Sequence, residues 1–318
     1  MIGFQPRGRL QSQQGLSLVE LMISMVLGLA IVAAVGTLSV NALRSYRALS
    51  QASEQIENGR YALKIIRDDL EHAGFWGAFN PANTNLPASQ PDPCTTPAPP
   101  FQNLIDSFPF PVTGTCTASL TSKVNGTKAL ILLRADSRAT LPADVGKPEN
   151  AGKTYLQTTP AAYVIGKGAT AAAYSLQKPD GSTADIRQLH VRIYYIRSYS
   201  QTGDGIPTLM RKDPIDSDTN AQALVEGIEN LQIQYGIDSD RDGSPNSYTA
   251  SPASVADWSN VIAVKTYVLA RSLAPTPGYT DTKSYDLGNL SVTPGGPYHR
   301  RVFSQTIRLI NASGRREP

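Results

Sequence analysis

Between Arg9 and Arg44 the chain carries one charged side chain, Glu20. The residues from Leu21 to Leu43 are mostly apolar, and a helix rising about 1.5 Å per residue would extend roughly 35 Å over them, enough to span a membrane. An ionised carboxylate in such a segment is costly, although the helix dipole favours negative charge in the first helical turn. Ionisable groups inside membranes generally have a function, so we interpret Glu20 as functional; the alternative is a signal anchor with an incidental Glu.

The residues around Glu20 also form a motif. Residues 15–22 read Gly-Leu-Ser-Leu-Val-Glu-Leu-Met, and a short polar leader with Arg7 and Arg9 precedes them. This segment resembles the cleavage and assembly motif of type IV prepilins and type II secretion pseudopilins. A secretory signal peptide loses its apolar segment on cleavage, whereas this arrangement keeps it. The resemblance implies that prepilin peptidase cuts between Gly15 and Leu16 and that the new terminus is N-methylated.

The same resemblance implies a role for Glu20 in assembly. In that family the carboxylate at the fifth mature position neutralises the terminal amine of a neighbouring subunit, which here is the nitrogen of Leu16. Breaking a buried ion pair by removing one partner costs about 3 to 5 kcal/mol. We therefore expect fibre assembly to require Glu20.

After the apolar run the pattern becomes amphipathic. From Arg44 to Ala73 apolar residues recur every three or four positions between charged ones, and Gly74 follows at a typical helix end. We expect one helix from about Leu16 to Ala73 and an α+β, pilin-like fold, in which this helix packs on a carboxy-terminal antiparallel β-sheet domain. The expected divisions are a leader (1–15), a transmembrane and assembly helix (16–43), an amphipathic helix (44–74) and a periplasmic β-rich globular domain (75–318).

Composition supports a β domain after the helix. Charged residues make up only 17% of the chain, while 25 Gly and 23 Pro favour many loops. Strands are predicted at residues 128–133, 163–166, 188–199, 207–211, 231–237, 261–269 and 301–310. Gly203, Asp204 and Gly205 predict a hairpin turn, and residues 220–229 predict a short helix. Residues 75–122, rich in Pro, Asn, Thr and Ser, predict a long surface excursion.

Cys94 and Cys116 are the only cysteines, and they lie in this Pro-rich segment. Neither has metal-ligand spacing to other residues, so a disulfide in an oxidising compartment is predicted; two free buried thiols are the alternative. Charge gives little help with topology, because Arg7 and Arg9 before the apolar run are balanced by Arg44 and Arg47 after it. The disulfide favours a periplasmic location for the globular domain.

Two later segments, residues 65–77 and 224–236, resemble PilW-type minor pilins, which are similar to pseudopilin J of type II secretion. The resemblance implies a minor pilin of a type IV pilus, used for twitching, adhesion or DNA uptake, that primes pilus assembly at or near the tip. It implies other minor pilins, the major pilin, prepilin peptidase and a tip adhesin as partners, and a single-pass protein of the bacterial inner membrane.

The alternative is a pseudopilin at the tip of a type II secretion pseudopilus; the length of the chain favours the pilus. A third interpretation is a membrane-anchored ligand-binding protein unrelated to fibres. It would require the motif from Gly15 to Glu20 to occur by coincidence.

Other function classes find little support in the sequence. The net charge of +3, without a basic stripe, does not indicate a nucleic-acid partner. The three histidines, His72, His190 and His299, have no metal-ligand spacing, and the chain has no nucleophile elbow or phosphate-binding loop. We therefore do not expect an enzyme.

One segment suggests a cofactor, calcium. Asp238, Asp240 and Asp242 alternate and are followed by a glycine, as in the first half of an EF-hand loop. Thr249 stands where that loop has its bidentate Glu, so a site would need Ser244, Asn246, backbone carbonyls or water and would bind weakly. An exposed Asp/Gly turn without a metal explains the same residues, and both interpretations remain open.

Overall fold

The computed structural model describes residues 15, 17–81, 84–94, 101–168, 173–216 and 220–314. The chain divides into two compact units, Met1–Ser50 and Gln51–Pro318. The α-helix α1 (Leu18–His72) begins in the first unit and ends in the second. This confirms the predicted helix, although Leu16, its expected first residue, lies outside the described residues. Gly74 follows with φ 74°, the left-handed conformation expected just after a helix end.

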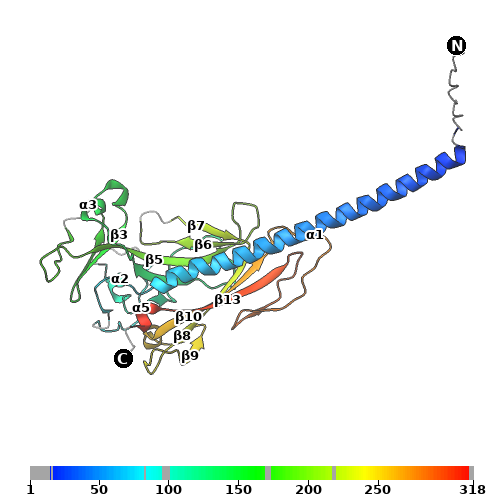
Figure 1. Cartoon of the computed structure of the whole chain (residues 1–318). Coiled ribbons are helices and arrows are strands. Elements are labelled where there is room, and N and C mark those ends of the chain that lie inside the picture. Colours follow the sequence, from blue (N-terminus) through cyan, green and yellow to red (C-terminus); the bar gives the residue numbers. More distant parts are fainter. Residues whose placement is uncertain are drawn as a thin grey trace, which may run out of the picture. The chain divides into compact units, whose positions relative to one another are not determined.

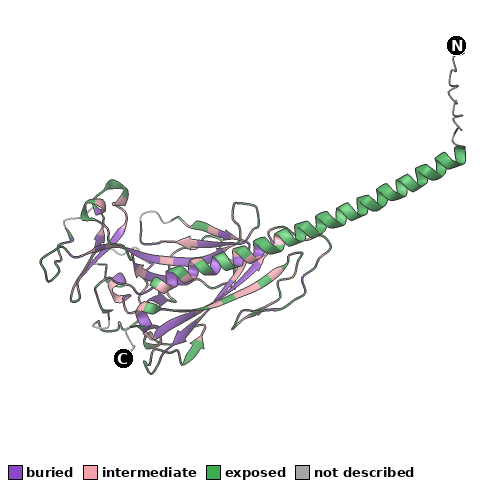
Figure 2. Ribbon diagram, viewed as in Figure 1, coloured by how far each residue is buried: buried purple, intermediate pink, exposed green. Residues whose placement is uncertain are grey.

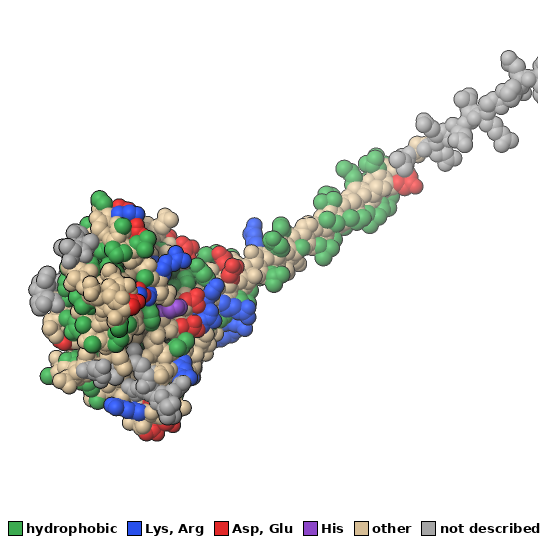
Figure 3. All heavy atoms as spheres, turned by 60° about the vertical axis from the view of Figure 1, so that its left-hand side comes forward, with side chains coloured by type: hydrophobic (Ala, Val, Ile, Leu, Met, Phe, Trp, Pro, Cys, Tyr) green, Lys and Arg blue, Asp and Glu red, His purple; other side chains and the backbone are tan. Residues whose placement is uncertain are grey.

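In the first unit, every described residue is exposed (Figure 2). Large apolar side chains such as Leu21, Val26 and Leu29 are more than half exposed, and Figure 3 shows hydrophobic atoms along this part of α1. The helix is long and apolar enough to cross a membrane. Apolar surface of this extent is unfavourable in water, so these residues need lipid or other protein around them.

Within its described residues, the second unit contains two larger antiparallel sheets and a two-stranded one (Figure 1). The first sheet consists of β1 (Val112–Thr113), β2 (Leu130–Ala135), β5 (Ile186–Arg197), β3 (Thr154–Thr158) and β4 (Tyr163–Lys167) in that order, with β6 (Thr208–Lys212) pairing with β5 and β7 (Gln222–Glu226). The second has the order β13 (Arg300–Arg308), β10 (Val261–Arg271), β8 (Ile228–Ile237) and β9 (Ser247–Thr249). Strands β11 (Tyr285–Asp286) and β12 (Ser291–Val292) form the third. Short helices are α2 (Gln102–Asp106), α3 (Pro142–Val145), the 3-10 helix η2 (Pro148–Asn150), α4 (Val255–Ser259) and α5 (Ile310–Ser313).

All seven strands predicted from sequence are present, with ends shifted by a few residues: β2, β4, β5, β6, β8, β10 and β13. The hairpin at residues 203–205 is also confirmed, because β5 and β6 pair antiparallel on either side of it. Along β5 the side chains alternate between two cores, since successive residues of a strand point to opposite faces. Tyr194 and Ile196 contribute to one core, and Ile193 and Tyr195 to the other.

The first of these cores joins α1 to both large sheets. Ala62, Leu63, Ile66 and Leu70 are the buried face of the helix within it. The helix also contacts β13 closely, because a Cβ atom added to Gly59 would lie 2.3 Å from the ring of Phe303. The amphipathic pattern of this part of α1 is therefore explained by burial against the β strands.

The predicted helix at residues 220–229 is wrong. Residues 222–226 form strand β7, which pairs with β6, and β8 begins at Ile228. Gly227 lies between the two strands with φ 75°, and a Cβ atom there would lie 2.9 Å from the carbonyl oxygen of Arg271. A helix would have required continuous helical backbone through this glycine.

The predicted surface excursion at residues 75–122 is only partly confirmed. Residues 84–92 and 114–122 are exposed or half-buried, but other parts of the segment belong to the core. Trp76, Phe108 and Phe110 are almost completely buried. The Trp76 and Phe108 rings stack with their centroids 4.6 Å apart, and the Trp76 indole N–H donates to the Phe108 carbonyl oxygen over 3.0 Å. Trp76, Phe108 and several neighbouring aromatic residues fill the core on the face of the first sheet away from α1, together with Leu133. Large aromatic surfaces favour burial strongly, and here they outweigh the polar composition of the segment.

Candidate processing and assembly site

The start of α1 is a capping box formed by Ser17 and Glu20. The backbone N–H of Ser17 donates to Oε2 of Glu20 over 3.0 Å, and the backbone N–H of Glu20 faces the Ser17 hydroxyl oxygen at 3.4 Å. This reciprocal pair satisfies backbone donors that a helix start otherwise leaves without partners. The signature Ser-x-x-Glu is present in the sequence, so Glu20 has a local role in the helix start besides its expected role in assembly.

The capping box leaves part of the Glu20 carboxylate available. Among the described residues, Oε1 of Glu20 makes no hydrogen bond, and the residue is exposed. One oxygen can therefore cap the helix while the other accepts from an amine outside the chain. Leu16, whose nitrogen is the expected partner, lies outside the described residues, so the charge pair stays a prediction.

Gly15, on the expected cleavage side, has open space around it. A Cβ atom added there would have no atom within 4 Å. A larger side chain at Gly15 would therefore meet no steric conflict with the described residues.

A buried ion-pair cluster, which no motif in the sequence predicts, fixes the other end of α1. Asp69 accepts from Arg192 at 2.5 and 2.7 Å and from Arg134 at 3.2 Å, and the Tyr194 hydroxyl donates to it. Burial pushes the pKa of Asp69 upward, but hydrogen bonding and charge from Arg192, with help from Tyr194 and Arg134, outweigh it and leave the pKa below its ordinary value. The cluster connects α1 to β2 and β5 of the first sheet.

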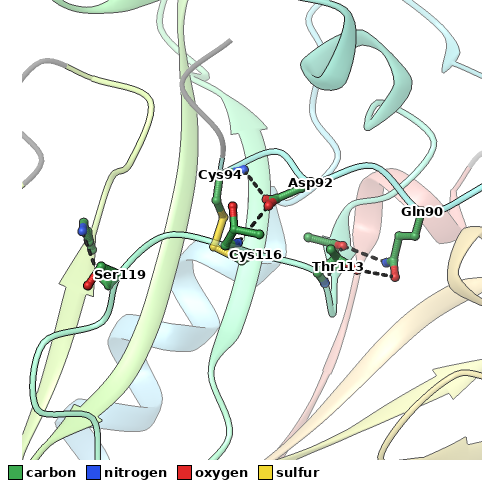
Figure 4. Close-up of a disulfide and its surroundings, with 9 residues drawn as sticks. Gln90, Asp92, Cys94, Thr113, Cys116 and Ser119 are labelled. Carbon is green, nitrogen blue, oxygen red and sulfur yellow. Dashed lines mark hydrogen bonds between the residues drawn. A yellow bond between two sulfur atoms is a disulfide. The ribbon is translucent and has the colours of Figure 1, made fainter.

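The predicted disulfide between Cys94 and Cys116 is present, with the two Cα atoms 5.2 Å apart (Figure 4). Asp92 reinforces it, because its carboxylate accepts from the backbone N–H groups of Cys94 at 2.9 Å and Thr117 at 2.8 Å. Gln90 donates to the hydroxyl oxygen of Thr113 over 2.7 Å in the same region. These contacts and the disulfide join residues 90–94 to residues 113–117, and both cysteines pack against the aromatic core.

The Asp-rich segment forms the loop between β8 and β9, which pair with each other. The structure brings Asp238, Asp240 and Asp242 together, with one carboxylate oxygen from each within 4.8 Å of the others. Asp238 is fully buried and accepts from the backbone N–H groups of Arg241 and Gly243. Such bonds also stabilise a turn without a metal.

The remaining predicted ligands are less favourably placed. The side-chain oxygen of Asn246 accepts from the backbone and hydroxyl of Ser239, and its amide nitrogen donates to Asp240 over 3.0 Å. Ser244 donates its backbone N–H to Asp242. The calcium site therefore has three clustered carboxylates and stays a prediction.

Comparison with known proteins agrees with these features. Residues 10–36 match the prokaryotic N-terminal methylation motif, and residues 193–311 match the family of type IV pilus-assembly protein W. The second match extends from β5 to α5 and includes strands of both large sheets. No curated protein and no solved structure matches the chain.

Together the two matches confirm the resemblance found in the sequence and support a type IV pilus-related pilin. The pilin motif and the apolar helix that follows it indicate membrane anchoring. A pilus-assembly family also implies interaction with other pilins and with the pilus machinery.

Replacing Gly15 with leucine should prevent removal of the leader, because prepilin peptidase must accommodate a small residue before the cut. The unprocessed chain should accumulate in the membrane with its leader, residues 1–15, still attached. Intact-mass spectrometry of the purified protein measures this directly. Gly8→Leu is the matched control, since it makes the same change within the leader and should be processed normally. A mature terminus at Leu16 in the Gly15 variant would contradict the predicted cleavage site.

Calcium should raise the melting temperature of the detergent-solubilised protein if the Asp-rich loop binds it. With a dissociation constant near 10⁻³ M, about 10 mM calcium adds about 1.4 kcal/mol, or a few degrees. Asp240→Ala with Asp242→Ala should abolish the rise. Asp180→Ala, at an exposed Asp-Gly turn elsewhere, should not. An unchanged melting temperature of the unmodified protein would eliminate the calcium site.

Proposed function

We propose that this protein is a minor pilin of a type IV pilus and that it primes pilus assembly with other minor pilins at or near the tip. The match of residues 193–311 to type IV pilus-assembly protein W carries the proposal. It distinguishes this chain from pilin-like proteins that share only the amino-terminal methylation motif. The matched families are structural, and we assign no catalytic residue.

The proposal divides the chain into a leader (1–15), a membrane and assembly helix (16–43), an amphipathic helix (44–74) and a periplasmic domain (75–318). The first half of α1 anchors the subunit in the inner membrane and later packs among the helices of the fibre. Its exposed apolar side chains suit both environments. The disulfide supports a periplasmic location for the second unit, because disulfides persist in oxidising compartments.

Assembly depends on the available oxygen of Glu20. In the apolar interior of a fibre, the amine of Leu16 from a neighbouring subunit needs a negative partner, and Oε1 of Glu20 supplies it. Other minor pilins and the major pilin are the expected neighbours. Prepilin peptidase acts before assembly, and a tip adhesin is the expected partner at the distal end.

Glu20→Val should be inserted and cleaved normally, since the membrane segment only becomes more apolar, but it should incorporate poorly into pili. The measurement compares the amount of this subunit in sheared pili with the amount in membranes. Strains lacking redundant minor pilins provide the background.

Glu20→Gln separates the charge pair from the capping box. The glutamine side-chain oxygen can still accept from the Ser17 N–H, but it carries no charge to neutralise an amine. The charge-pair role predicts poor incorporation for both variants. Normal piliation with Glu20→Gln would show that capping alone is needed and would contradict the charge pair.

A further inference from the structure

The chain contains two Asn-Gly pairs, Asn58-Gly59 and Asn125-Gly126, in very different surroundings. Asn-Gly is chemically labile because glycine has no side chain to hinder attack by its own backbone nitrogen on the preceding side-chain amide. The reaction needs an accessible asparagine, a glycine N–H that is not held by another group, and freedom to rotate the peptide between them. The structure therefore decides which of the two pairs can react.

Asn58 and Gly59 lie inside α1, where the backbone N–H of Gly59 belongs to the helical hydrogen-bond pattern. Gly59 is buried, and the ring of Phe303 occupies the space beside it. Rotation of the Asn58-Gly59 peptide would break the helix and displace this ring. The pair is thus protected as long as α1 is folded.

Asn125 and Gly126 are the central residues of an exposed turn. The Thr127 backbone N–H reaches the carbonyl oxygen of Val124 at 3.4 Å, and Gly126 has φ 77°. Both central residues are exposed, nothing lies within 4 Å of a Cβ atom added to Gly126, and the Asn125 side chain makes no hydrogen bond within the described residues. The Gly126 N–H makes no hydrogen bond within the described residues, so it is free to lose its proton.

We propose that Asn125-Gly126 is a site of spontaneous deamidation and isoaspartate formation. The deprotonated backbone nitrogen of Gly126 attacks Cγ of Asn125, a new C–N bond forms, and the side-chain amide nitrogen leaves as ammonia. The resulting succinimide is hydrolysed by water. Water addition at Cγ gives aspartate, and addition at the backbone carbonyl gives isoaspartate, in which the chain continues through the side chain.

Charge near the turn favours the reaction. The Lys123 ammonium donates to the carbonyl oxygen of Thr127 over 2.5 Å, and Lys128 is near enough to lower the pKa of Lys123 further, beyond the effect of burial. The Lys123 ammonium lies on the carbonyl oxygens of Val124 and Thr127, the first and last residues of the turn, and a positive charge there favours the negative charge that develops on the Gly126 nitrogen.

The position gives the modification a structural consequence. The Val124 N–H donates to Ile196 of β5 in the first sheet, whereas the Gly126 carbonyl accepts from the buried Gln232 side chain of β8 in the second sheet. The turn is therefore a connection between the two sheets. Isoaspartate adds one carbon to the main chain at this connection, so older molecules should have a weaker link between the sheets.

The test incubates the purified full-length protein in detergent and maps its peptides by mass spectrometry, with separation of aspartyl from isoaspartyl forms. In folded protein, product should accumulate at Asn125 and not at Asn58, and the rate should rise about tenfold per pH unit because the reactive nitrogen must lose a proton. In urea, both pairs should react. Asn125→Gln should abolish the native-state product.

Two results would overturn the proposal. One is an unmodified Asn125 in folded protein over a period in which the urea sample reacts. The other is equal modification of Asn58 and Asn125 in folded protein, which would mean that the turn confers no selectivity. Asn125 is exposed and its side chain makes no hydrogen bond within the described residues, so the Asn125→Gln control should fold.

Discussion

Asp69→Ala should lower the free energy of unfolding by about 3 kcal/mol, the low end of the cost of breaking a buried ion pair, because Arg134 keeps Asp136 at 3.1 Å and Arg192 keeps Asp213 at 3.7 Å. The Asp69 side chain is only 8% exposed, and the Arg192 and Arg134 side chains that it binds are 14% and 12% exposed. Removing the carboxylate leaves two guanidinium groups inside the protein between α1 and the first sheet. We expect the carboxy-terminal part of α1 to detach more readily from the strands.

Urea unfolding followed by tryptophan fluorescence measures this effect. The chain has two tryptophans, Trp76 and Trp258, and both are buried. Asp68→Ala is the matched control, because Asp68 is the neighbouring residue but its side chain is 52% exposed and pairs with Arg67 at the surface. The control should change stability by less than about 1 kcal/mol. Equal effects of the two variants would contradict the role assigned to the buried cluster.

The same cluster predicts a pH dependence. Because the pKa of Asp69 lies below its ordinary value of 3.8 in the folded protein, folding favours the ionised carboxylate. The ionised Asp69 contributes its full stabilisation when the pH is above this ordinary pKa. The stabilisation is lost as the pH falls through the lower pKa of the folded state. Asp69→Asn should therefore lose less stability on acidification than the unmodified protein.

Removal of the disulfide should also destabilise the protein strongly. Cys94 and Cys116 are 22 residues apart, and the chain-entropy model gives about 3 kcal/mol for a loop of this length. The double variant Cys94→Ala with Cys116→Ala avoids leaving a free thiol. Its urea unfolding midpoint should fall, and Trp76 should report the change because it lies in the same core as Cys94.

Gln90→Ala provides the comparison for the disulfide variant. It removes the hydrogen bonds of Gln90 to Thr113 and Thr115, which join the same two stretches of chain as the disulfide, but it keeps the covalent link. It should lower stability by only about 1 kcal/mol. If the double cysteine variant were no less stable than Gln90→Ala, the disulfide would not be what holds this segment in place.

The parts of the fold that the sequence predicted well have strong local patterns. The apolar run after Glu20 and the three-to-four spacing up to Ala73 specify α1, and alternation specifies long strands such as β5 and β10. Strand β7 was missed because a five-residue segment has too little periodicity, and its pairing with β6 decides its conformation. The aromatic core was missed because Trp76 and Phe108 are separated by a Pro-rich and Thr-rich stretch.

The candidate site was only partly predictable for the same reason. The motif from Gly15 to Glu20 is local and was identified directly. The partners of Asp69, in contrast, lie 65 and 123 residues away along the chain, and only the folded sheet brings Arg134 and Arg192 to it. Spacing in the sequence cannot reveal contacts of that kind.

We propose that this chain primes a type IV pilus, and deletion of its gene is the decisive experiment. Surface pili and twitching should be lost, secretion of exoproteins should remain normal, and the unmodified chain supplied in trans should restore piliation. Normal pili and twitching together with blocked exoprotein secretion would contradict the claim and assign the chain to a type II secretion pseudopilus.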